Sequence, residues 1–133
     1  MTINASDYIQ LDRRDPVTGA GSMATIQAYG TTANTAAVTQ LTSRTTGVTI
    51  NSPVGVITLV SAAGGAAASF VVTNSFVAVG DVVGCSVGVG VDPRSVSIYN
   101  VAAGSFTVST TAISGTTTEQ PTLNFCVHKA ALV

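Results

Sequence analysis

The sequence predicts an all-β fold, a two-sheet β-sandwich or jelly roll that follows an extended N-terminal arm. From Ala37 onward, short runs alternate apolar with polar or small residues, and Gly, Pro, Asn or Asp separates the runs. No segment of useful length has the period of a helix. The chain has 133 residues, of which 46% are hydrophobic and 8% charged, which suits one weakly charged domain and excludes a disordered chain.

Residues 1–37 differ in character from the rest of the chain. Five of the charged residues lie in the first fifteen positions: Asp7, Asp12, Arg13, Arg14 and Asp15. A stretch rich in Gly, Ala and Thr follows, with one short apolar patch at Met23–Tyr29. We therefore expect an arm over 1–37, with at most one strand of its own, and a β-sandwich domain over 38–133.

Period-2 alternation predicts which side chains of the sandwich face its core. The expected inward residues are, in chain order, Val48, Ile50, Phe70, Val72, Val83, Cys85, Val87, Val89, Val96, Ile98, Phe106, Val108, Leu123, Phe125 and Val127. Turns or loops are expected at 51–53, 62–68, 92–93, 103–104 and 114–115. These boundaries leave about seven or eight strands, which is enough for two packed sheets.

The strand over 82–91 carries almost no side chains on its second face. Gly84, Ser86, Gly88 and Gly90 alternate there with the apolar residues. Such a face lets another backbone approach closely, so these four residues are candidates for a subunit interface. The alternative is a bulged strand that packs closely within one chain.

The net charge of −1 gives no basic cluster, so we expect no nucleic-acid partner. The start of the chain lacks the features of a secretory signal. The apolar stretch Pro53–Val72 has the length of a membrane span, but its Gly, Val and Ile residues favour strands, so we expect no membrane partner. Cys85 and Cys126 are expected to be packing residues without a disulfide.

Patterns that could carry chemistry are weak. The pentapeptide Gly84–Gly88 matches G-x-S-x-G, but a nucleophile elbow needs a turn and a helix after its strand, and here the match lies within a strand pattern. Gly19–Ala24 loosely resembles a dinucleotide loop without the flanking strand and helix. His128 is the only histidine and shares a strand face with Cys126, which is too few ligands for an ordinary metal site. We expect no catalytic residues, no metal and no cofactor.

The segment Thr39–Asn51, with the sequence TQLTSRTTGVTIN, resembles the opening of a recurrent β domain in virion proteins of tailed phages. Three further stretches fit the same domain: Thr73–Ser75 with Asp81–Val83, Val101–Phe106, and Gly115–Glu119 followed by Pro121–Ala130. The resemblance implies a capsid decoration (cement) protein: a homotrimer of jelly-roll type that binds the major capsid protein on the outer surface of the head. It implies synthesis in the cytoplasm of the host bacterium. The alternative within the same resemblance is a trimeric tail-fibre or receptor-binding knob.

On this interpretation the charged residues of the arm contact the capsid or a neighbouring trimer. Arg44 is the best candidate in the domain for a specific ionic contact, with Asp81 or Glu119 as possible partners. The competing interpretation of Arg44 is a solvated charge at the end of a strand. A small esterase built on Ser86 is a third class, which depends on the pentapeptide alone.

Overall fold

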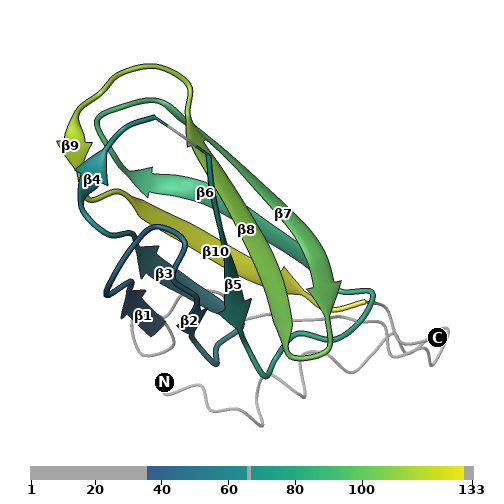
Figure 1. Cartoon of the computed structure of the whole chain (residues 1–133). Helices are drawn as coiled ribbons and strands as arrows, with labels where there is room; N and C mark the ends of the chain where they lie inside the picture. Colours follow the sequence, from purple (N-terminus) through teal and green to yellow (C-terminus); the bar gives the residue numbers. More distant parts are fainter. Residues whose placement is uncertain (1–35, 66, 131–133) are drawn as a thin grey trace, which may run out of the picture.

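The computed structural model describes residues 36–65 and 67–130, and within them all regular structure is β (Figure 1). The strands are β1 (Ala36–Thr39), β2 (Val48–Thr49), β3 (Val54–Thr58), β4 (Ala62–Ala63), β5 (Ala68–Thr73), β6 (Val82–Val89), β7 (Arg94–Ala102), β8 (Ser105–Ala112), β9 (Thr118–Glu119) and β10 (Thr122–His128). The described residues contain no helix, so the all-β prediction is confirmed.

The strands form two four-stranded sheets and one small sheet. The first sheet has the order β1-β3-β10-β6 and the second the order β2-β5-β8-β7, while β4 and β9 pair with each other. Each large sheet has one parallel pair at an edge, β1 with β3 and β2 with β5, and its remaining pairs are antiparallel. The arrangement is therefore mixed, and the β4–β9 pair lies at one end of the molecule (Figure 1).

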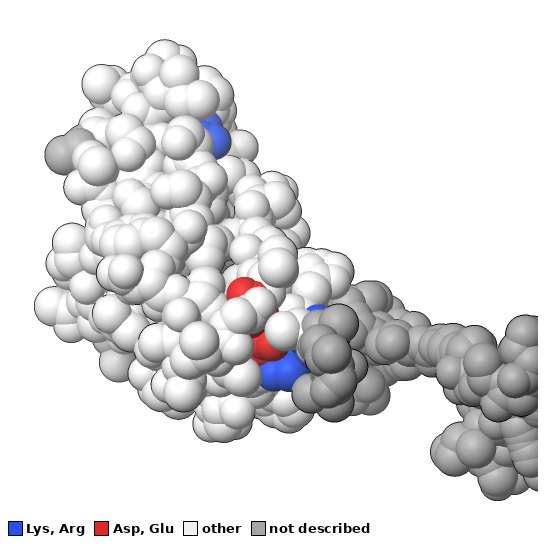
Figure 2. All heavy atoms as spheres, turned by 90° about the vertical axis from the view of Figure 1, so that its right-hand side faces the viewer, with Lys and Arg blue, Asp and Glu red and all other residues white. Residues whose placement is uncertain are grey.

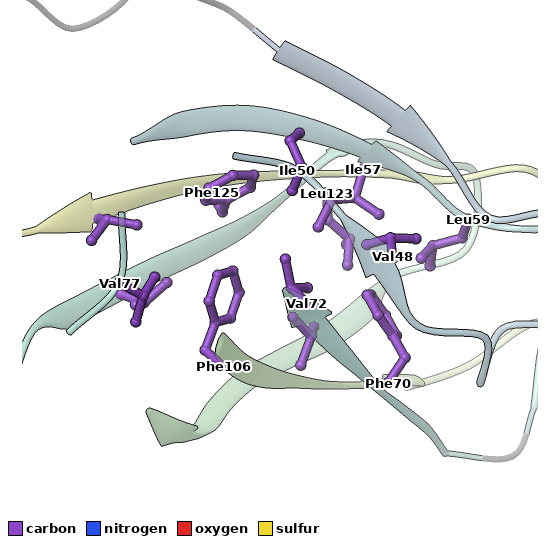
Figure 3. Packing of buried hydrophobic residues seen from close by; sticks show 13 residues of the cluster. Val48, Ile50, Ile57, Leu59, Phe70, Val72, Val77, Phe106, Leu123 and Phe125 are labelled. Carbon is purple, nitrogen blue, oxygen red and sulfur yellow. The ribbon is translucent and has the colours of Figure 1, made fainter. Parts of the chain in front are cut away.

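The buried faces of the two large sheets share one hydrophobic core (Figure 3). Ile57, Leu123 and Phe125 reach it from the first sheet, and Phe106 and Val72 from the second, because alternate residues of each strand point to the same side. Such side chains each contribute about 1.5–3 kcal/mol when fully buried, so this layer supplies most of the stabilisation.

The alternation predicted nearly all of this core. Every residue of the expected inward set is buried, or partly buried against the core, with the exception of Val89. Val89 is 67% exposed, so its assignment to the core is wrong. The physical reason is a β-bulge: Leu123 pairs with Val87 but Thr122 pairs with Val89, which leaves Gly88 as an extra residue that interrupts the alternation.

Most of the expected turns are confirmed. Gly104 joins β7 to β8 at φ 80°, and Gly115 follows β8 at φ 92°. Residues that carry a Cβ rarely adopt such a positive φ. The segment 62–68 is not wholly a loop, because Ala62–Ala63 forms β4 and β5 begins at Ala68. β1 begins at Ala36, within the range assigned to the arm.

The five charged residues of the arm, Asp7, Asp12, Arg13, Arg14 and Asp15, lie outside the described residues. Among the residues that are described, no helix is long and apolar enough to cross a membrane.

Candidate functional site

A buried ion pair joins β7 to β9 near the small sheet. Arg94 Nη2 lies 3.0 Å from Glu119 Oε1, and the two side chains are 2% and 5% exposed. The other carboxylate oxygen of Glu119 accepts hydrogen bonds from the backbone N–H groups of Val91 and Asp92. The bond from Val91 is the largest cause of a lowered Glu119 pKa, and the bond from Arg94 adds to it, while burial acts in the opposite direction. Glu119 is thus held as a carboxylate that orders the chain before β7.

Arg44 lies beside this pair and holds backbone segments together. Its Nε donates to the carbonyl of Val60 at 3.1 Å, and its Nη2 donates to the carbonyls of Ala62 at 2.6 Å and Glu119 at 3.0 Å. Desolvation and the nearby positive charge of Arg94 lower the pKa of Arg44. An arginine with three such hydrogen bonds is not merely a solvated charge at the end of a strand.

The carboxylates expected to pair with Arg44 are engaged elsewhere. Glu119 pairs with Arg94 through its side chain and offers Arg44 only its backbone carbonyl. Asp81 pairs with Lys129, at the other end of β10. The sequence-based prediction correctly placed Arg44 near Glu119. It missed Arg94, because the pairing of Arg94 depends on strand order and not on any local pattern.

Asp92 completes the charged group next to the small sheet. Its Oδ2 accepts the backbone N–H of Thr117 at 2.8 Å. Two glycines, Gly64 and Gly115, pack so closely against this carboxylate that a Cβ on either would collide with it. The loops before β5 and after β8 therefore both lie against the same carboxylate.

A second ion pair fixes the other end of β10. Asp81 accepts hydrogen bonds from the backbone N–H groups of Ala78 at 2.8 Å and Ala130 at 2.9 Å, and from Lys129 Nζ at 2.5 Å. Lys129 Nζ also donates to the carbonyl of Phe76 at 2.7 Å. The hydrogen bond from Lys129, followed by those from Ala130 and Ala78, lowers the pKa of Asp81 to about 2. The side chain of Asp81 is 2% exposed, whereas that of Lys129 is 51% exposed.

All the charged side chains within the described residues thus have structural partners: Arg44, Asp81, Asp92, Arg94, Glu119 and Lys129. The surface instead presents apolar side chains. Those at least 65% exposed are Leu41, Val79, Val82, Val89, Val91 and Ile113. Figure 2 shows one face of the molecule, on which the atoms of charged residues form only small patches. The described surface therefore presents few unpaired charges that could recognise a charged ligand.

The glycines of β6, Gly84 and Gly88, lie close to side chains of the neighbouring strand β10 in the same chain. A Cβ on Gly88 would lie 2.7 Å from Thr122 Oγ1 and 2.8 Å from Asn124 Nδ2, and a Cβ on Gly84 would lie 3.4 Å from Cys126 Sγ. Gly90 lies near the carboxylate of Glu119. The bulged, closely packed strand is therefore present. The role of Gly84, Ser86, Gly88 and Gly90 at a subunit interface stays a prediction.

The pentapeptide Gly84–Gly88 lies wholly within β6, so the strand context predicted for it is confirmed. Both cysteines are free thiols. Burial raises the pKa of the Cys85 thiol to about 11, with a smaller contribution from Cys126. On the opposite face of the sheet, Cys126 Sγ lies 3.2 Å from His128 Nε2. Across 36–65 and 67–130, no three His, Cys, Asp or Glu side chains gather as metal ligands would.

The described domain thus pairs its charged side chains internally and exposes apolar side chains. No family model, curated protein or solved structure matches the chain.

Proposed function

We propose that this chain is a phage capsid decoration (cement) protein. It acts as a homotrimer that binds the outer surface of the head and stabilises the shell by bridging major capsid proteins. The observation that carries the proposal is the combination of internally paired charges with exposed apolar side chains across the described domain. Such a domain has apolar side chains available for contact with protein, while its described charged side chains are engaged within the fold.

The energetics of a cement protein fit this surface. A trimer that makes three contacts with the shell gains affinity through effective concentration, by about 10²–10⁴ over a single contact. Each contact can therefore be weak and built from side chains such as Leu41 and Ile113, which are 90% and 69% exposed. Contacts of this kind depend little on salt, whereas exposed ion pairs are screened.

Within this proposal the sandwich is of jelly-roll type, and two sheets of four strands around one core support that assignment. The parallel edge pairs β1–β3 and β2–β5 are departures from a wholly antiparallel roll. Both place strands from the N-terminal part of the domain on sheet edges.

The arm supplies the ionic part of the contact with the shell. Its charged residues, Asp7, Asp12, Arg13, Arg14 and Asp15, precede a domain whose own charges are all engaged. Any salt-dependent component of binding should therefore reside in residues 1–15.

The test is co-sedimentation of the purified chain with shells assembled from the major capsid protein of the same phage. The proposal predicts saturable binding in multiples of three, and a chain lacking residues 1–15 should show lower occupancy and less dependence on salt. Unchanged occupancy after the deletion would refute the role of the arm. Failure of the full chain to bind shells, together with binding to tail tips or host cells, would favour the alternative of a trimeric tail-fibre knob.

A further inference from the structure

We propose that the flank of the sandwich formed by the edge strands β6 and β7 accepts a strand from the N-terminal arm of a neighbouring copy of this chain. The strand it accepts is the apolar run Met23–Tyr29, which adds to the free edge of β7. The inference rests on the homotrimer of the proposed function, because it states how the copies hold one another. It does not depend on binding to a capsid.

The core is incompletely covered on this flank, where β6 lies beside β7. Val108 on β8 is 0% exposed, whereas Ile98, its partner on β7, is only partly buried. The first sheet repeats the contrast, because Phe125 on β10 is 4% exposed and its partner Cys85 on β6 is only partly buried. An added strand would remove more of this apolar surface from water. The side chains concerned are Cys85, Val87, Val96, Ile98 and Val101.

β7 also has a backbone edge that no other described strand occupies. It is the last strand in the order β2-β5-β8-β7 and has nine residues. Proteins usually shield such an edge by making it short, by a bulge, or by Lys or Pro. The edge strands β1 and β2 have only four and two residues, and β6 has the bulge at Gly88. Between Ser95 and Tyr99, β7 has none of these features, so it is the edge best able to accept a further strand.

The composition of Met23–Tyr29 fits this edge. The run has a glycine near each end and contains no charged residue. In an extended strand, Ile26 would share one face with two alanines. Thr25 and Gln27 would lie on the other face, together with the two end residues of the run. The first face matches the apolar inner side of β7, and the second matches its exposed outer side, which carries serines.

The donor is a neighbouring copy because each chain enters its own domain at the opposite flank. β1 begins at Ala36 and lies beside β2, on the side of the sandwich away from β7 (Figure 1). A route around the sandwich crosses three strand spacings of about 4.8 Å each and the gap of about 10 Å between sheets. The seven peptide steps from Tyr29 to Ala36 span at most about 25 Å, so a chain's own arm would have to be fully taut. Three copies that each pass an arm to the next form a closed ring.

The test is disulfide cross-linking between copies of the full chain, with no capsid present. Chains with Ser97→Cys, on the exposed side of β7, are co-expressed with chains carrying Thr25→Cys or Gln27→Cys and are then oxidised. Mass spectrometry should find a disulfide that joins position 97 of one chain to position 25 or 27 of another. The wild-type chain, which keeps Cys85 and Cys126, gives the background.

Ser69→Cys is the matched control for Ser97→Cys. Ser69 is exposed in the same row of the same sheet, but it lies on β5, two strands away from β7. A disulfide requires Cα atoms within about 7 Å, and two strand spacings are about 10 Å. Ser69→Cys should therefore give at least about tenfold less cross-linked product.

A point variant tests the apolar side of the added strand. Ile26→Asp would place a charge without a partner beside Val96 and Ile98. Sedimentation of the full chain should show association weakened by at least about tenfold. Ile9→Asp makes the same change in the arm outside the run, and it should leave association unchanged. Circular dichroism checks that each variant is folded.

Three results would overturn the proposal: no cross-link to position 97 between folded chains, equal cross-linking from Ser69→Cys, or a disulfide within a single chain of the double variant Thr25→Cys/Ser97→Cys. The last result would mean that each chain binds its own arm. Failure of capsid decoration is a separate outcome. Chains that exchange arms but do not bind shells would refute decoration alone, whereas trimers that bind shells without the cross-link would refute the exchange alone.

Discussion

Phe106 of β8 and Phe125 of β10 bring one aromatic ring from each large sheet into contact, with ring centroids 5.6 Å apart and planes inclined at 51°. The two residues are 0% and 4% exposed. Tilted aromatic pairs of this kind are worth about 0.5–1.5 kcal/mol beyond the area that they bury. The contact is therefore a principal link between the two sheets.

Truncation of this link should strongly destabilise the domain. Phe106→Ala leaves a cavity between the sheets, and we expect it to lower the free energy of unfolding by about 3–5 kcal/mol. Phe76→Ala is the matched control, because Phe76 is 48% exposed and its loss should cost about 1 kcal/mol or less. Urea denaturation of both variants measures the difference. Equal losses would mean that the Phe106–Phe125 contact is not central to the core.

The buried pair of Arg94 and Glu119 makes a second prediction. Glu119→Gln keeps an amide oxygen that can accept the N–H of Val91, but it leaves the guanidinium of Arg94 buried without a counter-charge. Arg94 Nε already has no hydrogen-bond partner among the described residues. We expect Glu119→Gln to lower the Tm by several degrees.

The double variant Arg94→Met/Glu119→Gln removes the uncompensated charge as well. It should have a higher Tm than Glu119→Gln alone, because a buried unpaired charge costs more than the loss of both partners. A Tm of the double variant equal to or below that of Glu119→Gln would contradict this dependence of one side chain on the other.

Acid should destabilise the domain through Asp81. Its pKa is lowered from 3.8 to about 2 in the folded chain, because Lys129 and two backbone N–H groups donate hydrogen bonds to the carboxylate. A folded pKa below the unfolded one gives stability that is present above the unfolded pKa, and this stability is lost as pH falls from 3.8 towards about 2. The lowered pKa of Glu119 acts in the same direction.

The measurement is the urea midpoint as a function of pH across that window, for the wild type and Asp81→Asn. The variant should be less stable at neutral pH, and its midpoint should fall less steeply with acid. A variant with the same pH dependence as the wild type would show that Asp81 does not contribute to acid sensitivity.

Alanine substitutions at two glycines with positive φ distinguish the cost of backbone strain from the cost of a collision with a neighbouring side chain. Gly104 has open space around its Cβ position, so Gly104→Ala should cost only the strain of the left-handed conformation, about 1–2 kcal/mol. Gly115→Ala should cost more, because its Cβ would also collide with the carboxylate of Asp92. Thermal unfolding compares the two. A smaller loss for Gly115→Ala would mean that the Asp92 carboxylate is free to move away.

Alternation in the sequence was enough to predict the all-β class and most of the core. Phe106 with Val108, and Leu123 with Phe125, follow period 2 because each lies in a regular strand with one buried face. Val89 could not be assigned in this way, because the bulge at Gly88 depends on pairing with β10. A glycine within an alternating strand was the available signal for that bulge.

The ionic contacts were beyond sequence reasoning for a similar reason. Arg94 and Glu119 are 25 residues apart and meet only because the start of β7 lies beside β9. Arg44 reaches the carbonyl of Glu119 across 75 residues. No local pattern specifies which of several carboxylates a given arginine will meet. The Cys126–His128 pair, by contrast, follows from spacing on one strand.

The measurement that tests the central proposal most directly is an electron cryomicroscopy reconstruction of shells incubated with the full chain. A capsid decoration protein should add density on the outer surface of the head, with three copies of the chain around each position and contacts to more than one major capsid subunit. Shells whose outer surface is unchanged at saturating concentrations of a folded chain would contradict it.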